Sequence, residues 1–286
     1  MAKEFLVCID SDGCAYDTME IKHKECFCPA FIRAFSLQPV SKYAREAWEF
    51  VNLYSSLRGV HRFRALLKAL ELLAMRREVA ERAFQVPSLP ILSSYVASGA
   101  PLTNDALKEF AARNGDPAEL STVLEWSYDV NARIKAMVTG VPPFPHVREC
   151  LKKLSEKADV VVVSATPVEA LEREWKENGL TPYLASIEGQ ESGTKKEIIA
   201  SLKNRYAPGR VLMIGDAPGD LDAARAHGAL FYPVCPGNEA DSWKEFEAKE
   251  MDRFLSLSYA GDAEEKRIAH FLTLLPDEPA WLKGEK

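Results

Sequence analysis

The stretch Phe5-Leu6-Val7-Cys8-Ile9-Asp10-Ser11-Asp12-Gly13 stands near the start of the chain. Its five apolar residues are hydrophobic on both alternating faces, which is typical of a parallel strand covered by helices on both sides. The two aspartates and the glycine follow directly. Ligands of parallel sheets bind at the carboxyl ends of the strands, so Asp10 and Asp12 occupy a position where chemistry is expected.

Further apolar runs of the same kind occur later in the chain, at residues 160–163, 211–214 and 229–234. Helical patterns of apolar residues lie between and around these runs, at 147–156, 167–178, 195–206 and 220–227. Alternating strands and helices of this length predict an α/β fold with a Rossmann-like, doubly wound parallel sheet.

The hydrophobic pattern changes after the first strand: strand-like runs disappear, and long helical patterns replace them. Such patterns cover residues 41–57, 61–84 and 104–114. We therefore predict an α/β core domain made of residues 1–18 and 141–286, and an inserted all-helical cap domain made of residues 19–140. The segment after Pro236 has helical patterns at 241–257 and 263–275, and its role is not evident from the sequence.

Composition and charge exclude several classes of protein. The 286 residues are 47% hydrophobic and 27% charged, as in ordinary globular proteins. The net charge is −6, and no basic run exceeds two residues, so we expect no nucleic-acid partner and no anionic membrane partner. The six cysteines lack the spacing of a disulfide scaffold, and no apolar run is long enough for a signal peptide or a membrane span. We expect a soluble, cytoplasmic protein; the oligomeric state is left open.

Carboxylates follow two of the predicted strands. Asp10 and Asp12 come after the first strand, and Asp216 and Asp220 come after the third. Clustered carboxylates repel one another unless they share a cation, and their hard oxygens suit Mg²⁺, which commonly pairs with a phosphate group of the substrate. The pattern thus predicts a Mg²⁺ site at one edge of the sheet.

Two other positions offer groups that bind phosphate. Ser164 follows the second strand and is expected at the head of a helix, where free backbone N–H groups hold anions. Lys195 begins another predicted helix and adds a positive charge; the adjacent Lys196 is the alternative. Together with the carboxylates, these residues predict a site for phosphoryl transfer.

In this order and at these strand ends, the residues resemble the four motifs of the haloacid dehalogenase-like hydrolase superfamily. The resemblance covers about residues 1–18 and 141–240, and the predicted helical insertion is similar to the cap of that superfamily. It implies that Asp10 is the nucleophile, which becomes an aspartyl phosphate, and that Asp12 is the acid and base. Ser164 and Lys195 would bind the transferring oxygens. Mg²⁺ would be held by Asp10, by Asp12 through its main-chain carbonyl and by Asp216, with Asp220 beside Lys195 or the metal.

Residues around the motifs are candidates for binding the substrate. Gly13 and Ala165 are expected beside the phosphoryl group, and Arg62 and His23 of the cap are expected to contact the rest of the molecule. Cys14 stands where the superfamily often has threonine, and Ala165 stands where a polar residue is common, but neither removes a required chemical group. Because dehalogenases and phosphonate-cleaving relatives usually lack the second aspartate, Asp12 favours phosphate esters.

We therefore predict a Mg²⁺-dependent phosphatase that hydrolyses a small phosphorylated metabolite through an aspartyl phosphate. A phosphomutase acting on a sugar phosphate shares the same core and is the first alternative. A non-catalytic phospho-acceptor module is the second, although receiver domains of that kind carry the accepting aspartate after a middle strand and lack a large cap.

Overall fold

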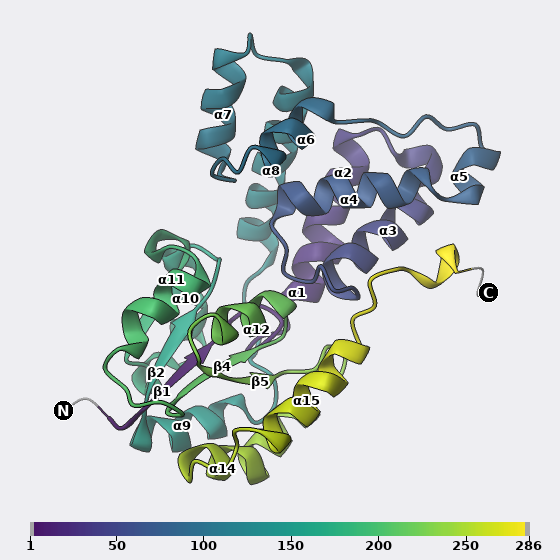
Figure 1. The fold of residues 1–286 in the computed structure, drawn as a ribbon. Helices are drawn as coiled ribbons and strands as arrows, with labels where there is room; N and C mark the ends of the chain where they lie inside the picture. The colour runs from purple at the N-terminus through teal and green to yellow at the C-terminus, as the bar shows by residue number, and fades with distance from the viewer. Residues whose placement is uncertain (1–2, 284–286) are drawn as a thin grey trace. The chain divides into compact units, whose positions relative to one another are not determined.

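The computed structural model describes residues 3–283, and the chain divides into two compact units (Figure 1). The first, called the sheet unit here, comprises Met1–Met19 and Thr139–Leu275. The second, called the helical unit, comprises Glu20–Val138 and Pro276–Lys286. The helical unit is thus built largely from a segment inserted after the first strand.

A five-stranded parallel sheet forms the centre of the sheet unit, in the order β3-β2-β1-β4-β5. Its strands are β1 Phe5–Ile9, β2 Ala158–Val163, β3 Ser186–Glu188, β4 Val211–Gly215 and β5 Leu230–Pro233. In the central register, Val7 of β1 pairs with Val160 on one side and Leu212 on the other. The prediction of a doubly wound α/β fold is confirmed. The edge strand β3 was not predicted, because its three half-buried residues form no apolar run.

Helices cover both faces of this sheet (Figure 1). Alternate residues of β1 enter two separate cores: Val7 packs with residues of α9, α10 and α14, whereas Cys8 packs with residues of α11, α12 and α15. The helical elements of the unit are the first half of α1 Thr18–Ile21, which continues into the helical unit, and α9 Val147–Lys157, α10 Val168–Glu177, η3 Thr181–Tyr183, η4 Gln190–Ser192, α11 Lys195–Lys203, α12 Pro218–Arg225, α13 Glu239–Glu245, η5 Phe246–Glu250, α14 Met251–Leu255 and α15 Asp262–Thr273.

Two residues lie at other positions relative to a helix start than predicted, and both starts involve proline. Helix α10 begins at Val168, so Ser164 lies in the loop before the helix and not at its head. The ring of Pro167 disfavours helical backbone at the residue before it, which delays the helix. Helix α12 begins at Pro218 and not at Asp220, because proline suits the first helical position. Asp220 is therefore the third residue of its helix.

The helical unit has an aromatic core. Trp48 and Trp126 meet edge to face with ring centroids 5.7 Å apart, and Phe31 lies 5.1 Å from Trp48. Its elements after α1 are η1 Lys22–Phe27, α2 Cys28–Ala34, η2 Gln38–Val40, α3 Ser41–Leu53, α4 Arg62–Ala74, α5 Arg77–Glu81, α6 Pro90–Ala97, α7 Asn104–Arg113, α8 Ala118–Met137 and, near the C-terminus, η6 Ala280–Leu282. Across residues 3–283, no helix combines the length and the apolar character needed to cross a membrane.

The last part of the chain belongs to the helical unit, whereas the sequence analysis assigned it to the α/β core. The indole of Trp281 lies 3.8 Å from the guanidinium of Arg76 and contacts the ring of Phe50 edge to face at 5.6 Å. The hydroxyl of Ser56 donates a hydrogen bond of 2.6 Å to Asp277. These contacts join segments more than 200 residues apart, so no local pattern in the sequence could indicate them.

Candidate active site

Three buried aspartates meet at the carboxyl edge of the sheet. Asp10 follows β1, Asp216 follows β4, and Asp220 lies in the first turn of α12. One carboxylate oxygen of each lies within 4.8 Å of the others, and in the described part of the chain this is the one group of three acidic, histidine or cysteine side chains that is close enough to hold a metal ion. The parallel topology explains the meeting, since neighbouring strands end at the same edge.

Lys195, at the first position of α11, lies among these acids. Its ammonium is 2.7 Å from Oδ2 of Asp10 and 2.6 Å from Oδ1 of Asp220. Thr194 holds the start of α11 by a capping box with Glu197. Lys196 is exposed and forms no ion pair within residues 3–283. Of the two lysines left open by the sequence, the structure therefore brings Lys195 to the aspartates.

The electrostatics of Asp10 fit a bound cation. Burial raises the pKa of its carboxyl well above the usual range, and the negative charges of Asp220 and Asp216 raise it further, while Lys195 lowers it. One lysine cannot neutralise three carboxylates. Hard oxygen ligands with excess negative charge are the donor set that Mg²⁺ prefers, so the residues present fit this metal.

Two glycines allow the close approach of the motif loops. A side chain at Gly215 would lie 2.5 Å from the carboxylate of Asp220, so only glycine lets that carboxylate pack against the end of β4. Gly13 adopts the left-handed conformation, with φ of 75°, and its N–H donates to the carbonyl of Tyr16 at 2.8 Å. The chain therefore makes a tight turn directly after Asp12.

Asp12 is held by two threonines. The hydroxyl of Thr166 donates to its Oδ2 at 2.8 Å, and the hydroxyl of Thr18 donates to its Oδ1. Its side chain is not part of the carboxylate cluster, and the role of its main-chain carbonyl as a metal ligand stays a prediction. Neither threonine was among the predicted site residues. Thr166 had a usable signal, since it stands two residues after Ser164 at the same strand end.

Ser164 is buried at the end of β2. Its N–H donates to the carbonyl of Glu188 at 3.0 Å, and its hydroxyl accepts from the N–H of Thr166 at 3.3 Å. Ala165 is exposed. Ser164 was expected at the N-terminus of a helix. Instead it lies in the loop before α10, where its hydroxyl holds the main chain of that loop.

Arg62 and His23 belong to the helical unit, and both contact the ring of Phe27 there. The guanidinium of Arg62 lies 5.1 Å from that ring and donates to Ser127 Oγ at 3.0 Å and to Asn131 at 2.7 Å. The imidazole of His23 stacks on the ring at a centroid distance of 4.7 Å. Their assignment to substrate binding stays a prediction.

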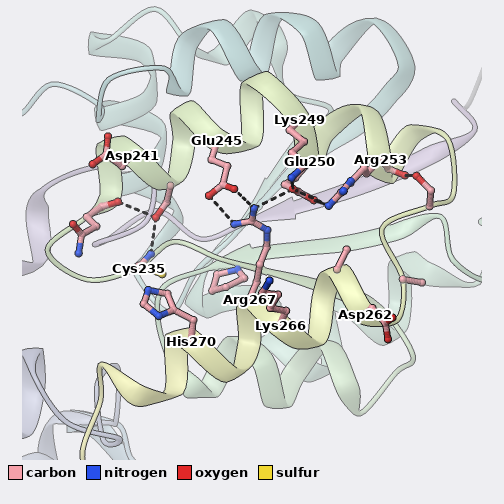
Figure 2. Close-up of a pocket in the computed structure, with 16 residues that line it drawn as sticks. Cys235, Asp241, Glu245, Lys249, Glu250, Arg253, Asp262, Lys266, Arg267 and His270 are labelled. Carbon is pink, nitrogen blue, oxygen red and sulfur yellow. Dashed lines mark hydrogen bonds and ion pairs between the residues drawn. The ribbon is translucent and has the colours of Figure 1, made fainter.

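A cavity of about 1060 Å³ lies elsewhere in the sheet unit, among α13, η5, α14 and α15 (Figure 2). Figure 2 shows Arg267 at its centre, paired with Glu245 and Glu250, while Arg253 also pairs with Glu250. None of the motif residues lines it. Large cavities are the usual place to look for an active site, but the arginine at the centre of this one is already paired with Glu245 and Glu250, so we locate the chemistry at the aspartates.

Known proteins resemble this chain in fold. No curated protein matches the chain. A solved protein from Lactobacillus delbrueckii subsp. bulgaricus, described as a candidate phosphoglycolate phosphatase, has 17% identity and a TM-score of 0.50, with 86% of this chain and 92% of that one covered. A haloacid dehalogenase-like family hydrolase from Xanthomonas campestris has 12% identity and a TM-score of 0.49, with 91% and 96% covered.

A family model provides the stronger result, since it matches residues 6–228, which is more than half of the chain. The matched segment contains all ten residues singled out above as candidate site residues. It ends before β5 and the C-terminal helices that line the cavity. The chain belongs to the haloacid dehalogenase-like hydrolase family.

Proposed function

We propose that this hydrolase is a Mg²⁺-dependent phosphatase that releases phosphate from a small phosphorylated metabolite through an aspartyl phosphate on Asp10. The observation that carries the proposal is the contact of Lys195 with Asp10 inside a buried group of three carboxylates. A charged nucleophile, a fixed cation and a cation site side by side are the parts that phosphoryl transfer requires.

Asp10 performs the first step. Its N–H donates to the carbonyl of Ile214 at 3.0 Å, and its Oδ1 accepts from the N–H of Ser11 at 2.8 Å, so the carboxylate is held before the substrate binds. A carboxylate oxygen attacks phosphorus, the bond to the ester oxygen breaks, and the phosphoryl group remains on Asp10. Lys195 balances the negative charge that the transferring oxygens bring to the site.

Asp12 moves the protons. It gives a proton to the leaving ester oxygen in the first step, and it takes a proton from the water that attacks the aspartyl phosphate in the second. The hydroxyls of Thr18 and Thr166 hold its two oxygens, so the side chain is oriented while it is ionised. Hydrolysis of the intermediate returns Asp10 to its carboxylate form and releases phosphate.

A divalent cation completes the site. The side chains of Asp10 and Asp216 and the main-chain carbonyl of Asp12 would hold Mg²⁺, with Asp220 holding Lys195 beside them. When bound, Mg²⁺ supplies positive charge that neutralises the carboxylates and the phosphoryl oxygens. Burial of the three aspartates supports this assignment, because buried like charges are unfavourable without a counter-ion.

Phosphate release from a panel of phosphorylated metabolites, with Mg²⁺ and with a chelator, tests the proposal. Phosphoglycolate belongs in the panel because the description of one similar structure names it. We expect release that requires Mg²⁺ and is abolished in Asp10→Asn. The matched control is Asp222→Asn, the same change on an exposed position of α12, which should keep full activity.

Two results would contradict the proposal. One is metal-dependent release that persists in Asp10→Asn, and the other is the absence of release from every member of the panel. Conversion of a sugar phosphate to its isomer without free phosphate would instead identify a phosphomutase.

A further inference from the structure

Ser11 separates the two aspartates of the first motif, and its side chain contacts a different part of the sheet unit from theirs. Its hydroxyl accepts a hydrogen bond of 3.0 Å from Nε1 of Trp175 and donates one of 3.0 Å to Oε2 of Glu174, both in α10. Asp10, in contrast, contacts Lys195 of α11. Ser11 and Trp175 are fully buried, so the hydrogen bond between them is shielded from water, whereas Glu174 is half-buried.

The main chain of Ser11 is the centre of the turn that carries the motif. Its carbonyl accepts from the N–H groups of Ala15 and Tyr16, each at 3.0 Å, and its N–H donates to Asp10. The ring of Tyr16 meets that of Trp175 edge to face, with centroids 5.4 Å apart. Helix α10 thus holds both ends of the turn, through the hydroxyl of Ser11 and through the ring of Tyr16.

We propose that Ser11 is a positioning residue for the cation site, acting with Trp175 and Glu174. This inference rests on the proposed function. The bonds of its hydroxyl fix the turn so that the carboxylate of Asp10 and the main-chain carbonyl of Asp12 remain oriented toward the cation. A hydroxyl is well suited to this position, because it can donate to a carboxylate and accept from an indole at the same time.

A serine in a buried turn could also serve stability alone, and Ser242 provides the comparison. Its hydroxyl is likewise buried, donates to the carbonyl of Asn238 at 2.8 Å and accepts from the N–H of Cys235 at 3.0 Å. It lies in α13, outside the motifs. Ser11→Ala and Ser242→Ala each remove one buried hydroxyl with one donated and one accepted bond, so they form a matched pair.

The test measures Mg²⁺ binding to the full-length protein by isothermal titration calorimetry, together with urea unfolding and phosphate release. Loss of groups that orient metal ligands typically weakens metal binding by about 10- to 100-fold. We expect Ser11→Ala to raise the Kd for Mg²⁺ about tenfold and to lower kcat, with little change in KM at saturating Mg²⁺. Ser242→Ala should unfold at a similarly lowered urea concentration, yet bind Mg²⁺ as the wild type does.

Trp175→Phe provides a second variant, because it keeps an aromatic ring beside Tyr16 and removes only the indole N–H. Trp175→Phe should also raise the Kd for Mg²⁺. In the double variant with Ser11→Ala, the increase in Kd should be smaller than the product of the two single increases. Wild-type Mg²⁺ affinity in Ser11→Ala, with a loss of stability equal to that of Ser242→Ala, would overturn the inference.

The outcomes also separate this inference from the proposed reaction. If the wild type binds Mg²⁺ but releases phosphate from no substrate, the reaction is wrong, and the change in Mg²⁺ affinity still decides the role of Ser11. If the wild type binds no Mg²⁺ at millimolar concentrations, both are wrong.

Discussion

The sheet unit and the helical unit bury charges of opposite sign. Among residues 3–283, the buried charged side chains of the sheet unit are the acids Asp10, Asp216, Asp220 and Glu250, whereas those of the helical unit are Arg58 and Arg76. Burying a charge is costly in either unit unless a partner compensates it. The difference therefore lies in how each charge is compensated.

The charges of the helical unit are compensated by their neighbours. Arg58 donates to the carbonyl of Leu53 at 2.9 Å, and Arg76 pairs with Glu46 and stacks on Trp281. In the sheet unit, Glu250 is also matched, since Arg253 and Arg267 contact it.

The group of three aspartates differs from these sites, because two of its members, Asp10 and Asp220, share one lysine and the third, Asp216, adds a further negative charge beside Asp10. An excess of buried negative charge stabilises no fold by itself. Its presence at the end of the sheet marks the functional part of the molecule, and the ion pairs elsewhere mark structural parts.

Replacing one of the two neighbouring lysines of α11 by alanine should have the largest effect on activity. Lys195→Ala removes the cation beside Asp10, and we expect kcat for phosphate release to fall about 100- to 1000-fold. Lys196→Ala is the matched control, and because its side chain is exposed, activity should stay within about twofold. Equal losses in the two variants would show that the contact in the structure is not the functional one.

Neutralising a buried acid should change the free energy of unfolding in opposite directions at Glu250, which is paired with arginines, and at Asp216, which lies among other aspartates. Glu250→Gln leaves Arg253 without its partner and Arg267 with Glu245 alone, and it should lower the free energy of unfolding by about 3 kcal/mol. Asp216→Asn relieves repulsion and, without metal, should raise it by about 1 kcal/mol. Urea unfolding with a chelator measures both. Destabilisation by both changes would remove the distinction drawn between the sites.

Removing the C-terminal contact should affect the helical unit alone. Trp281→Ala loses the stacking on Arg76 and the contact with Phe50, at a cost of about 2 kcal/mol. Hydrogen exchange should become faster in the helical unit and stay unchanged in β1 and β4. Leu282→Ala, at an exposed neighbouring position, is the control. Faster exchange in the sheet strands would contradict the grouping of this segment with the helical unit.

The pH dependence of stability should reveal a half-buried neutral histidine in the helical unit. Burial, aided by the positive charges of Arg62 and Arg64, lowers the pKa of His61 to about 4, and its Nδ1 accepts from the N–H of Phe63 at 3.3 Å. Between pH 4 and pH 6.5, the histidine of the unfolded chain, with a pKa near 6.5, is protonated, whereas that of the folded protein stays neutral. Stability is therefore fully present above pH 6.5 and is lost as the pH falls toward 4.

The size of this loss can be measured against a variant that does not titrate. Between pH 6.5 and pH 4.5 we expect about 2 kcal/mol of the free energy of unfolding to disappear in the wild type. His61→Asn retains a side-chain acceptor for the helix start and should lack this component. A wild type and variant with parallel pH profiles would show that His61 is not kept neutral.

Much of the sheet unit was predictable, because its signals are local. The apolar run of β1 has the same bounds in the sequence and the structure, and Lys195 begins its helix as expected. The predictions that were wrong are the place of Ser164 at the head of α10 and the start of α12 at Asp220, because prolines set where these helices begin. The edge strand β3 was missed because its residues are only half-buried. Thr166 and Thr18 were missed because a threonine near a strand end has many ordinary uses.

The sequence by itself determined the order of strands and helices, the helical insertion and the set of chemical groups after the strands, since period and residue type are properties of neighbouring positions. Only the tertiary structure decided which of two adjacent lysines meets Asp10, that α10 holds Ser11, and that Trp281 returns to Arg76. Those contacts join residues from 164 to more than 200 positions apart. They exist because the folded backbone brings those positions together, and no repeat or spacing along the chain encodes them.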